Sequence, residues 1–315
     1  MVGMSRRRFS QNRLLTFLLI ISVVVSLTLH LSRAVHDPRS HHDTLPAQGN
    51  PIATHDAAPS PGAPVDGQEP AGVVPVGDAA SWIPSPTARH ALTLVDHRHF
   101  HLGYDEQAKN PAWVAYALFG PITVHGHEHR PLTFETDFAT AAHVANSDYS
   151  HSGYDRGHLA PANAIFTRFG EQEMTETFVM SNVIPQVHSF NAGLWEDLES
   201  AIAGRDHKGD GWAGSQGFVW VINGPIYDQT PAAKRLRNGT WVPAALFSII
   251  FRHAGTSWDA LAFIMPNADG VMGPITRYQV TIGTIDRQAH LDVCAGLPSA
   301  QASELAQAGR GDLWP

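Results

Sequence analysis

The chain has 315 residues, 43% of them hydrophobic, which is enough for the packed core of one large domain or two modest ones. Its single Cys294 excludes an internal disulfide framework and a cysteine-based zinc site. Beyond the five arginines of residues 1–33, the chain holds 16 basic and 29 acidic side chains, a formal charge of −13. This acidic balance disfavours a protein that simply coats nucleic acid. It is compatible with an enzyme that has only a local patch of positive charge.

The first 35 residues are expected to form a basic segment with a membrane anchor or signal peptide. Residues 1–33 contain no acidic residue, and the apolar run Leu14–Leu31 would span roughly 27 Å as a helix, about the thickness of the hydrocarbon layer. Arginines on its N-terminal side predict a cytoplasmic N-terminus and an exported remainder, periplasmic or extracellular. No Ala-x-Ala pattern follows the run, so we expect a retained signal-anchor; cleavage would instead give a secreted protein.

Composition divides the rest of the chain. Residues 36–87 are rich in Pro, Ala, Gly and Asp and poor in large apolar side chains. Because such a segment cannot bury enough surface to offset its ordering entropy, we expect a disordered linker. Order should begin near Ala91, within one domain over residues 88–298, and we expect a poorly ordered tail over residues 299–315.

Two strands that pair with each other are predicted at the start of the domain, over residues 96–105 and 112–118, and a short helix over residues 138–145. Two runs of alternating histidines accompany them, one on the first strand and one in a loop: His97, His99 and His101, then His125, His127 and His129. Solvent-facing polar side chains are the simpler interpretation of these runs. A zinc or copper site is the alternative, since imidazole is the commonest metal ligand.

The stretch Tyr154–Pro161 gives the clearest indication of a functional site. If its residues alternate as in a strand, Arg156 and His158 point the same way and place a fixed cation beside a base. Gly157 between them has no side chain, so another backbone or a substrate can come close to the main chain there. This combination suits a site that handles phosphate.

The remaining elements complete an alternation of strands and helices. Residues 178–186 have the pattern of a strand end and a turn, and residues 190–202 carry apolar side chains at helical spacing, with Asn191 near the N-cap. Largely apolar strands suited to the centre of a sheet are predicted over residues 217–222, 244–251 and 258–265, and a helix over residues 284–293.

Asn191 and Glu199 are eight residues apart, which is about 80° around a helix and roughly 12 Å along it. Both side chains cannot easily chelate one ion, but Asn191 can bind a metal directly while Glu199 acts through a coordinated water, an arrangement that suits Mg²⁺. Taken singly, each residue type has an ordinary structural explanation. A histidine is usually a hydrogen-bonded group, an asparagine at a helix start a cap, and a helical glutamate a solvent-facing side chain.

Three segments carry a resemblance to a known family: Gly153–Pro161 (GYDRGHLAP), Ser181–Gln186 (SNVIPQ) and Asn191–Glu199 (NAGLWEDLE). Residues 111–116, 221–225 and 263–267 add weaker matches. In these segments the chain resembles the DNA/RNA non-specific endonucleases, an endonuclease G-like family of ββα-metal nucleases, over nearly the whole ordered region. The resemblance implies an α+β fold of the ββα-metal (His-Me finger) type, with a central antiparallel sheet and helices packed on its faces.

The resemblance also implies an activity, the hydrolysis of phosphodiester bonds of DNA and RNA to 5′-phosphate products with Mg²⁺, or Mn²⁺ in its place. In that activity His158 is the general base, Asn191 is the direct metal ligand and Glu199 orients metal-bound water. Contacts to the backbone of the substrate rather than to base edges would leave the sequence unread, hence non-specific cleavage.

Three further residues receive supporting roles from the resemblance. Arg156 and Arg130 would stabilise phosphate charge, and Asn182 would support the site through a hydrogen bond to His158 or to the phosphate. One departure concerns a lysine that the family often has near the end of the Val-Pro strand. Here the residues after Val242–Pro243 are AALFS, and we expect the loss of that cation to weaken substrate binding without touching a catalytic role.

These roles are chemically coherent. A phosphodiester resists attack because water is a poor nucleophile and charge builds on the phosphoryl and leaving oxygens, so a base and a cation must both be in place. Imidazole, with an unperturbed pKa near 6.5, can accept a proton from water at neutral pH. Two other classes stay open: an inactive relative that binds nucleic acid or a protein on the same surface, and a cell-surface protein that binds metal through its histidines. Intact His158, Asn191 and Glu199 argue against the first.

Overall fold

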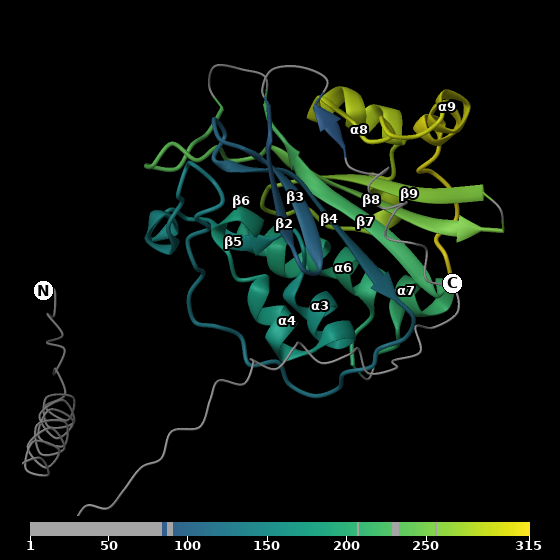
Figure 1. Ribbon diagram of the computed structural model, residues 1–315, viewed down its shortest axis with the longest axis horizontal. Helices are drawn as coiled ribbons and strands as arrows, with labels where there is room; N and C mark the ends of the chain where they lie inside the picture. The colour runs from purple at the N-terminus through teal and green to yellow at the C-terminus, as the bar shows by residue number, and fades with distance from the viewer. Residues whose placement is uncertain (1–83, 87–90, 207, 229–232, 256) are drawn as a thin grey trace, which may run out of the picture. The chain divides into compact units, whose positions relative to one another are not determined.

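Six antiparallel strands form the centre of the fold in the computed structural model, which describes residues 84–86, 91–206, 208–228, 233–255 and 257–315 (Figure 1). From edge to edge the sheet runs β2 (Thr93–His97), β3 (Phe100–Asp105), β4 (Asn110–Phe119), β7 (Phe218–Ile226), β8 (Ala245–Ala254) and β9 (Ser257–Pro266). Because successive side chains of a strand face opposite sides, each long strand contributes to two cores. In β7, Val219 and Val221 join one apolar cluster, and Trp220 and Ile222 join the other.

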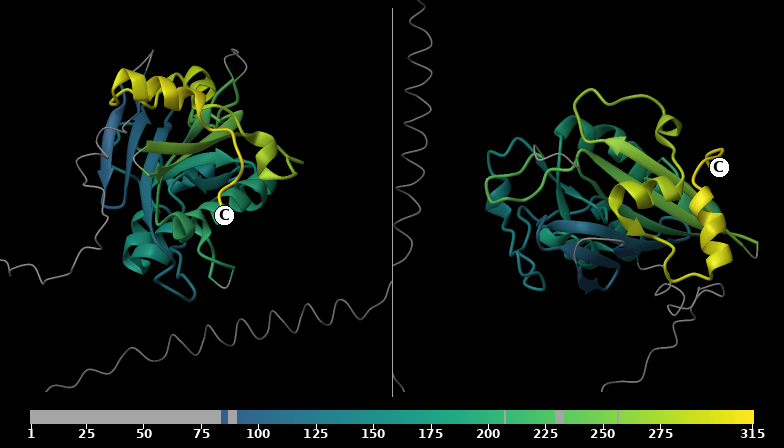
Figure 2. Two further views of the ribbon diagram at one scale, coloured as in Figure 1. Left: turned by 90° about the vertical axis from the view of Figure 1, so that its right-hand side faces the viewer. Right: turned by 90° about the horizontal axis from the view of Figure 1, so that it is seen from above.

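Helices cover both faces of this sheet, as two further views also show (Figure 2). On one face lie α3 (Ala162–Phe169), α4 (Glu171–Glu176), α6 (Glu196–Ala203) and α7 (Gly211–Gln216), and on the other α8 (Ile282–Ala289) and α9 (Ser299–Gln307). Leu198 and Ile202, four residues apart on α6, pack into the first core, and Ile282 and Ile285 of α8 pack into the second. The predicted α+β class, a central antiparallel sheet with helices on its faces, is confirmed.

Two shorter strand pairs lie outside the central sheet: β1 (Ser85–Pro86) with β10 (Leu291–Asp292), and β5 (Asp155–His158) with β6 (Val183–Gln186). Short helical turns connect the elements: η2 (Asn146–Tyr149), η3 (Met180–Asn182), α5 (His188–Phe190) and η5 (Ile275–Tyr278). The β5–β6 pair is tied to the central sheet by Asn223 of β7, whose buried side-chain amide donates to the main-chain oxygen of Leu159 at 2.7 Å. This bond sets the chain just after His158 against the sheet.

The predicted strand over residues 96–105 is a hairpin instead. The backbone reverses at Arg98 and His99, so that β2 pairs with β3, and β3 pairs in turn with β4. The predicted pairing with residues 112–118 is therefore confirmed for the second half of the expected strand. The alternating pattern runs unbroken through the two-residue turn, which contains neither glycine nor proline, and this hid the reversal.

The predicted helix over residues 138–145 is wrong, because these residues form irregular turns that precede η2. Glu106 accepts from the N–H groups of Ala141 and Ala142 at 2.9 and 2.8 Å. The N–H of Ala142 is one that the predicted helix would bond internally, so this carboxylate competes with the helix.

The C-terminal residues also differ from expectation, since they form a helix and a packed end rather than a poorly ordered tail. Leu305 of α9 is buried in the second core. Trp314 is only 6% exposed in the first core, with its ring centroid 5.7 Å from that of Trp212. Few large apolar residues occur after Ser299, and they show no helical or strand period, so composition alone suggested a tail. The predicted anchor, residues 1–35, and the predicted linker, apart from residues 84–86, lie outside the described residues.

Trp314→Ala is expected to lower the free energy of unfolding by about 3 kcal/mol, because it empties a buried aromatic site. Chemical denaturation of the full chain measures this loss. Asp312→Ala, at an exposed position two residues earlier, is the control and should change little. Equal stability of the two variants would contradict the packed end.

Candidate active site

The β5–β6 pair presents the predicted cation and base side by side. Arg156 and His158 alternate on β5 and lie opposite Pro185 and Val183 of β6. A Cβ at Gly157 would come within 2.1 Å of the Gln186 side chain, so the missing side chain of glycine makes room for Gln186. The close approach expected at Gly157 is made in this structure by the Gln186 side chain of β6.

The imidazole of His158 packs against two phenylalanine rings, whose own centroids lie 4.9 Å apart. The ring centroid of Phe134 is 5.0 Å away and that of Phe178, which meets the imidazole edge-on, is 4.8 Å away. Nε2 of His158 is buried and has no hydrogen-bond partner among the described residues. Burial, followed by the charge of Arg130, lowers the pKa of His158 to about 3. The ring is therefore neutral at pH 7, the form that a proton acceptor needs.

Asn182 holds the main chain beside the site. Its Oδ1 accepts from the N–H of Ala160 at 2.8 Å, and its Nδ2 donates to the main-chain oxygens of Ala160 and Thr177 at 3.1 and 3.0 Å. The side chain is fully buried. The predicted hydrogen bond to His158 is not among these contacts, so the support that Asn182 gives is to the backbone two residues beyond the base.

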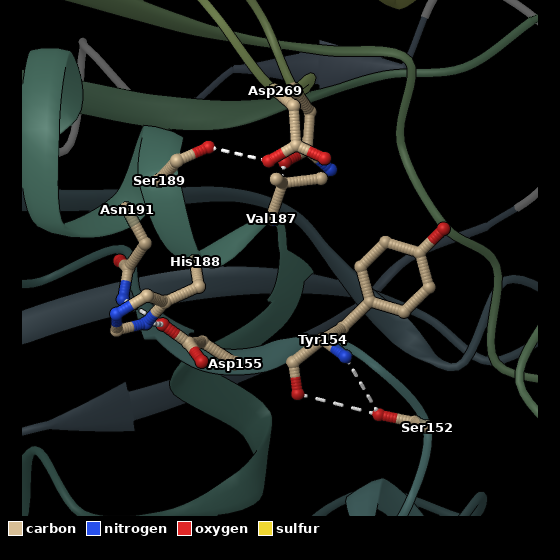
Figure 3. A network of polar contacts seen from close by, with 9 residues as sticks. Ser152, Tyr154, Asp155, Val187, His188, Ser189, Asn191 and Asp269 are labelled. Atoms are coloured by element: carbon tan, nitrogen blue, oxygen red, sulfur yellow. Dashed lines mark hydrogen bonds and ion pairs between the residues drawn. The ribbon is translucent and has the colours of Figure 1, made fainter. Parts of the chain in front are cut away.

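Asn191 lies inside a longer helical run rather than at its start. The run begins with α5, continues through η4 (Asn191–Trp195) and ends with α6. The backbone of Gly193 is not helical (φ −128°, ψ −111°), so the run consists of two helices joined at a kink two residues after Asn191. The side chain of Asn191 does not cap a helix, because its Nδ2 donates to Oδ2 of Asp155 at 3.0 Å (Figure 3). Since a carboxylate only accepts, this contact fixes the nitrogen end of the amide and leaves its oxygen for another partner.

Glu199 lies on α6 and lines the same cavity as Asn191 and His158. Burial raises the pKa of Glu199 to about 8, against the opposing effects of Trp195 and of the Arg130 charge. A carboxyl group with a raised pKa in a cavity is typical of sites that bind a cation or exchange protons.

One cavity of about 460 Å³ brings five of the six predicted residues together. Its lining includes Arg130, Arg156, His158, Asn191 and Glu199, but not Asn182. The two predicted arginines are held differently. Arg156 donates to the main-chain oxygen of Asn146 at 2.5 Å and its guanidinium lies 5.5 Å from the Tyr149 ring centroid, whereas Arg130, half exposed, pairs with Glu128.

The cavity also contains residues that the sequence reasoning missed. Arg205 supplies a third guanidinium, which contacts Glu196 and donates to Ser200 Oγ at 2.7 Å. Arg205 directly follows Gly204, the residue that ends α6. A basic residue just beyond the helix that carries Glu199 was the sequence feature that could have indicated it. Phe134 and Phe178 carry no such signal, because their contact with His158 arises only when distant segments come together.

The two histidine runs do not converge on one another. His97 pairs with Asp137, His99 stacks on Phe169 and His101 pairs with Asp96, while His125 pairs with Asp206 and His129 with Glu171. Within the described part of the chain, no group of three or more His, Cys, Asp or Glu side chains is arranged to hold a metal ion. The hairpin at Arg98–His99 explains the separation of the first run, because its three members no longer share one strand.

Comparisons with known proteins agree on one family. The model of the DNA/RNA non-specific endonuclease family matches residues 85–300. The mitochondrial nuclease EXOG of Danio rerio is 31% identical over 221 residues, which cover 65% of this chain and 61% of the EXOG chain. Human mitochondrial endonuclease G is also 31% identical, over 63% of this chain and 68% of the endonuclease G chain. A solved EndoG/EndoGI complex matches with a TM-score of 0.57 and 26% identity, covering 67% of this chain and 89% of that one. The chain thus spans about three fifths of the length of the Danio rerio relative.

These comparisons contradict the predicted export. The curated relatives are named mitochondrial nucleases, not periplasmic, extracellular or secreted ones. Across residues 84–86 and 91–315, where the structure describes them, no helix has the length and apolar character needed to cross a membrane. The predicted span Leu14–Leu31 lies outside those residues, so membrane attachment is unsupported and the expectation of export was wrong.

Asn182→Ala is expected to cost about 2 kcal/mol or more of folding free energy, because buried backbone groups of Ala160 and Thr177 lose their partners. Thermal and urea unfolding of the full chain measure this. Asn191→Ala, which removes a single partly buried hydrogen bond between side chains, is the matched control and should cost less. If both variants unfold together with the parent, Asn182 does not hold the backbone.

The His158 ring is expected to stay neutral at pH 5, where an unperturbed imidazole is mostly protonated. Since its folded pKa lies below its unfolded one, the contribution of His158 to stability falls as pH drops from about 6.5 towards 3. Arg130→Gln should raise the pKa by removing a repelling charge, whereas Arg310→Gln, exposed beyond α9, should not. Ring ¹⁵N chemical shifts report both effects, and an imidazolium signal from His158 at pH 5 in the parent would refute them.

Proposed function

Because the chain belongs to the DNA/RNA non-specific endonuclease family, we propose that it is a magnesium-dependent endonuclease that hydrolyses phosphodiester bonds of DNA and RNA and leaves 5′-phosphate ends. The shared cavity is the observation that carries this proposal. Its lining combines a neutral imidazole, an anchored amide, a carboxyl with a raised pKa and three guanidiniums. This set supplies a base, a site for a hard cation and positive charge for phosphate.

The cavity residues fit Mg²⁺, or Mn²⁺ in its place. With Nδ2 of Asn191 committed to Asp155, the amide oxygen is the atom left for a cation, and oxygen is the donor that Mg²⁺ prefers. A single protein ligand suits an ion that keeps most of its water, and Glu199, which lines the same cavity, would orient such a water. When bound, the ion would supply positive charge beside the leaving 3′ oxygen.

His158 would act as the general base. Its ring is neutral and packs against Phe134 and Phe178, which restricts its orientation before substrate arrives. A pKa near 3 makes the His158 imidazole a weak base, but a phosphodiester anion in the cavity would favour the imidazolium and raise that pKa. Since Nε2 is buried from solvent, Nδ1 is the ring nitrogen that would accept the proton of the attacking water.

The three guanidiniums would bind the phosphate backbone. Arg156 is restrained by Asn146 and Tyr149, Arg205 by Ser200 and Glu196, and Arg130 by its pair with Glu128. Guanidinium groups match phosphate oxygens in geometry and charge. These contacts carry no base information, which accounts for cleavage of both DNA and RNA without sequence preference.

His158→Ala is expected to lower the rate of plasmid nicking by about 100-fold or more, because removal of a general base costs that much. Asn191→Ala should lose most activity, and excess Mg²⁺ should restore part of it. EDTA should abolish nicking by the parent, and end-labelling of products should reveal 5′-phosphates.

His253→Ala, an exposed histidine on β8, is the matched control and should cleave like the parent. Cleavage by His158→Ala at the parent rate would refute the base assignment. A parent that binds nucleic acid without metal and cuts neither DNA nor RNA would instead identify an inactive relative.

A further inference from the structure

His188 contacts the residue that orients the proposed metal ligand. Its Nδ1 lies 2.8 Å from Oδ2 of Asp155, and the same oxygen accepts from Nδ2 of Asn191 at 3.0 Å (Figure 3). Because the carboxylate only accepts, the histidine must present Nδ1–H to it, and two donors converge on one oxygen. Oδ2 of Asp155 therefore joins His188 and Asn191, which are three residues apart on the helical run.

The backbone around His188 is fixed independently of its ring. The N–H of Val187 donates to Oδ1 of Asn267 at 2.8 Å, and the hydroxyl of Ser189 donates to Oδ1 of Asp269 at 2.6 Å (Figure 3). Both anchors come from the chain after β9. Removing the imidazole would thus leave the start of the helical run in place and delete mainly the contact with Asp155.

His188 stands outside the catalytic cavity, which is lined by Asp155 and Asn191 but not by the histidine. Its side chain is 79% exposed, against 33% for Asp155. An effect of His188 on the cavity must therefore pass through the carboxylate. We propose that His188 is a positioning residue that, through Asp155, holds the Asn191 amide with its oxygen turned to the metal; this inference rests on the proposed function.

Asn191 depends on this contact because its own amide can rotate. If Asp155 swings away, neither end of the amide is favoured towards the cavity, and a metal must first order the side chain. With Asp155 held by His188 on one side, the amide is ordered in advance. Partners that orient metal ligands typically contribute about 10- to 100-fold to metal affinity, and an exposed ion pair contributes less, so we expect about fivefold.

The direct test is calorimetric titration of Mn²⁺ into the full chain, with the Mg²⁺ concentration for half-maximal nicking as a second readout. His188→Ala should weaken both by about fivefold, while the rate at saturating metal stays within about twofold of the parent. His188→Asn places an amide N–H near the position of Nδ1 and should restore binding. His188→Gln places the amide N–H near the position of Nε2, away from Asp155, and should not restore binding.

His101→Ala is the matched control, because it deletes another imidazole whose Nδ1 pairs with a carboxylate, that of Asp96, on the β2–β3 hairpin outside the cavity. It should bind Mn²⁺ like the parent. Unchanged Mn²⁺ affinity in His188→Ala would overturn the proposal. Rescue by glutamine but not asparagine, with a raised KM for nucleic acid, would also overturn it, since His188 would then touch substrate through Nε2. A parent that binds Mn²⁺ through Asn191 yet cuts no nucleic acid would contradict the proposed function alone.

Discussion

The site depends on two buried amides that hold the main chain just beyond His158. The side chain of Asn223, in the central sheet, donates a hydrogen bond to the carbonyl oxygen of Leu159. The side chain of Asn182 accepts from the N–H of Ala160 and donates to the carbonyl oxygen of the same residue. Both side chains are almost completely buried, where an unmade hydrogen bond is costly, so these residues have little freedom to shift. The short β5–β6 pair is thereby fixed against a large sheet, and the backbone of His158 is held as firmly as the core.

A second constraint is electrostatic. The chain is acidic as a whole, yet three guanidiniums line one cavity and lower the cost of bringing an anion there. Two of them are already paired with Glu128 and Glu196. A phosphate must therefore compete with carboxylates for these donors, which suits an enzyme that releases its product better than a protein that holds nucleic acid tightly.

Local sequence patterns were sufficient to place strands β4, β7, β8 and β9 and the helix that carries Glu199, because long apolar runs are typical of buried strands and apolar side chains at helical spacing are typical of a helix on a core. They were insufficient where side chains compete with the backbone, as Glu106 does with the helix expected near Ala142, or where a turn lacks glycine and proline, as at Arg98–His99. The same holds at the site. Motif residues such as His158 and Asn191 could be named in advance, but the phenylalanines around the base and the guanidinium of Arg205 could not, since their places follow from tertiary packing.

The role of Asn182 shows the limit of inference by resemblance. The motif predicted a supporting role for this residue through His158 or the phosphate, but its partners in the structure are backbone atoms of Ala160 and Thr177. Asp155 shows the converse, because it stood within the motif without a role and proves to be the acceptor that joins Asn191 to His188. In both cases the identity of the partner required coordinates.

The central claim is that the cavity beside His158 is a metal-dependent nuclease site with Asn191 as the protein ligand. Anomalous diffraction from crystals soaked in Mn²⁺ tests it most directly. The account predicts one strong peak within coordination distance of the Asn191 side-chain oxygen, with Nδ2 still bonded to Asp155. A peak at the histidine runs, or none in this cavity, would contradict it.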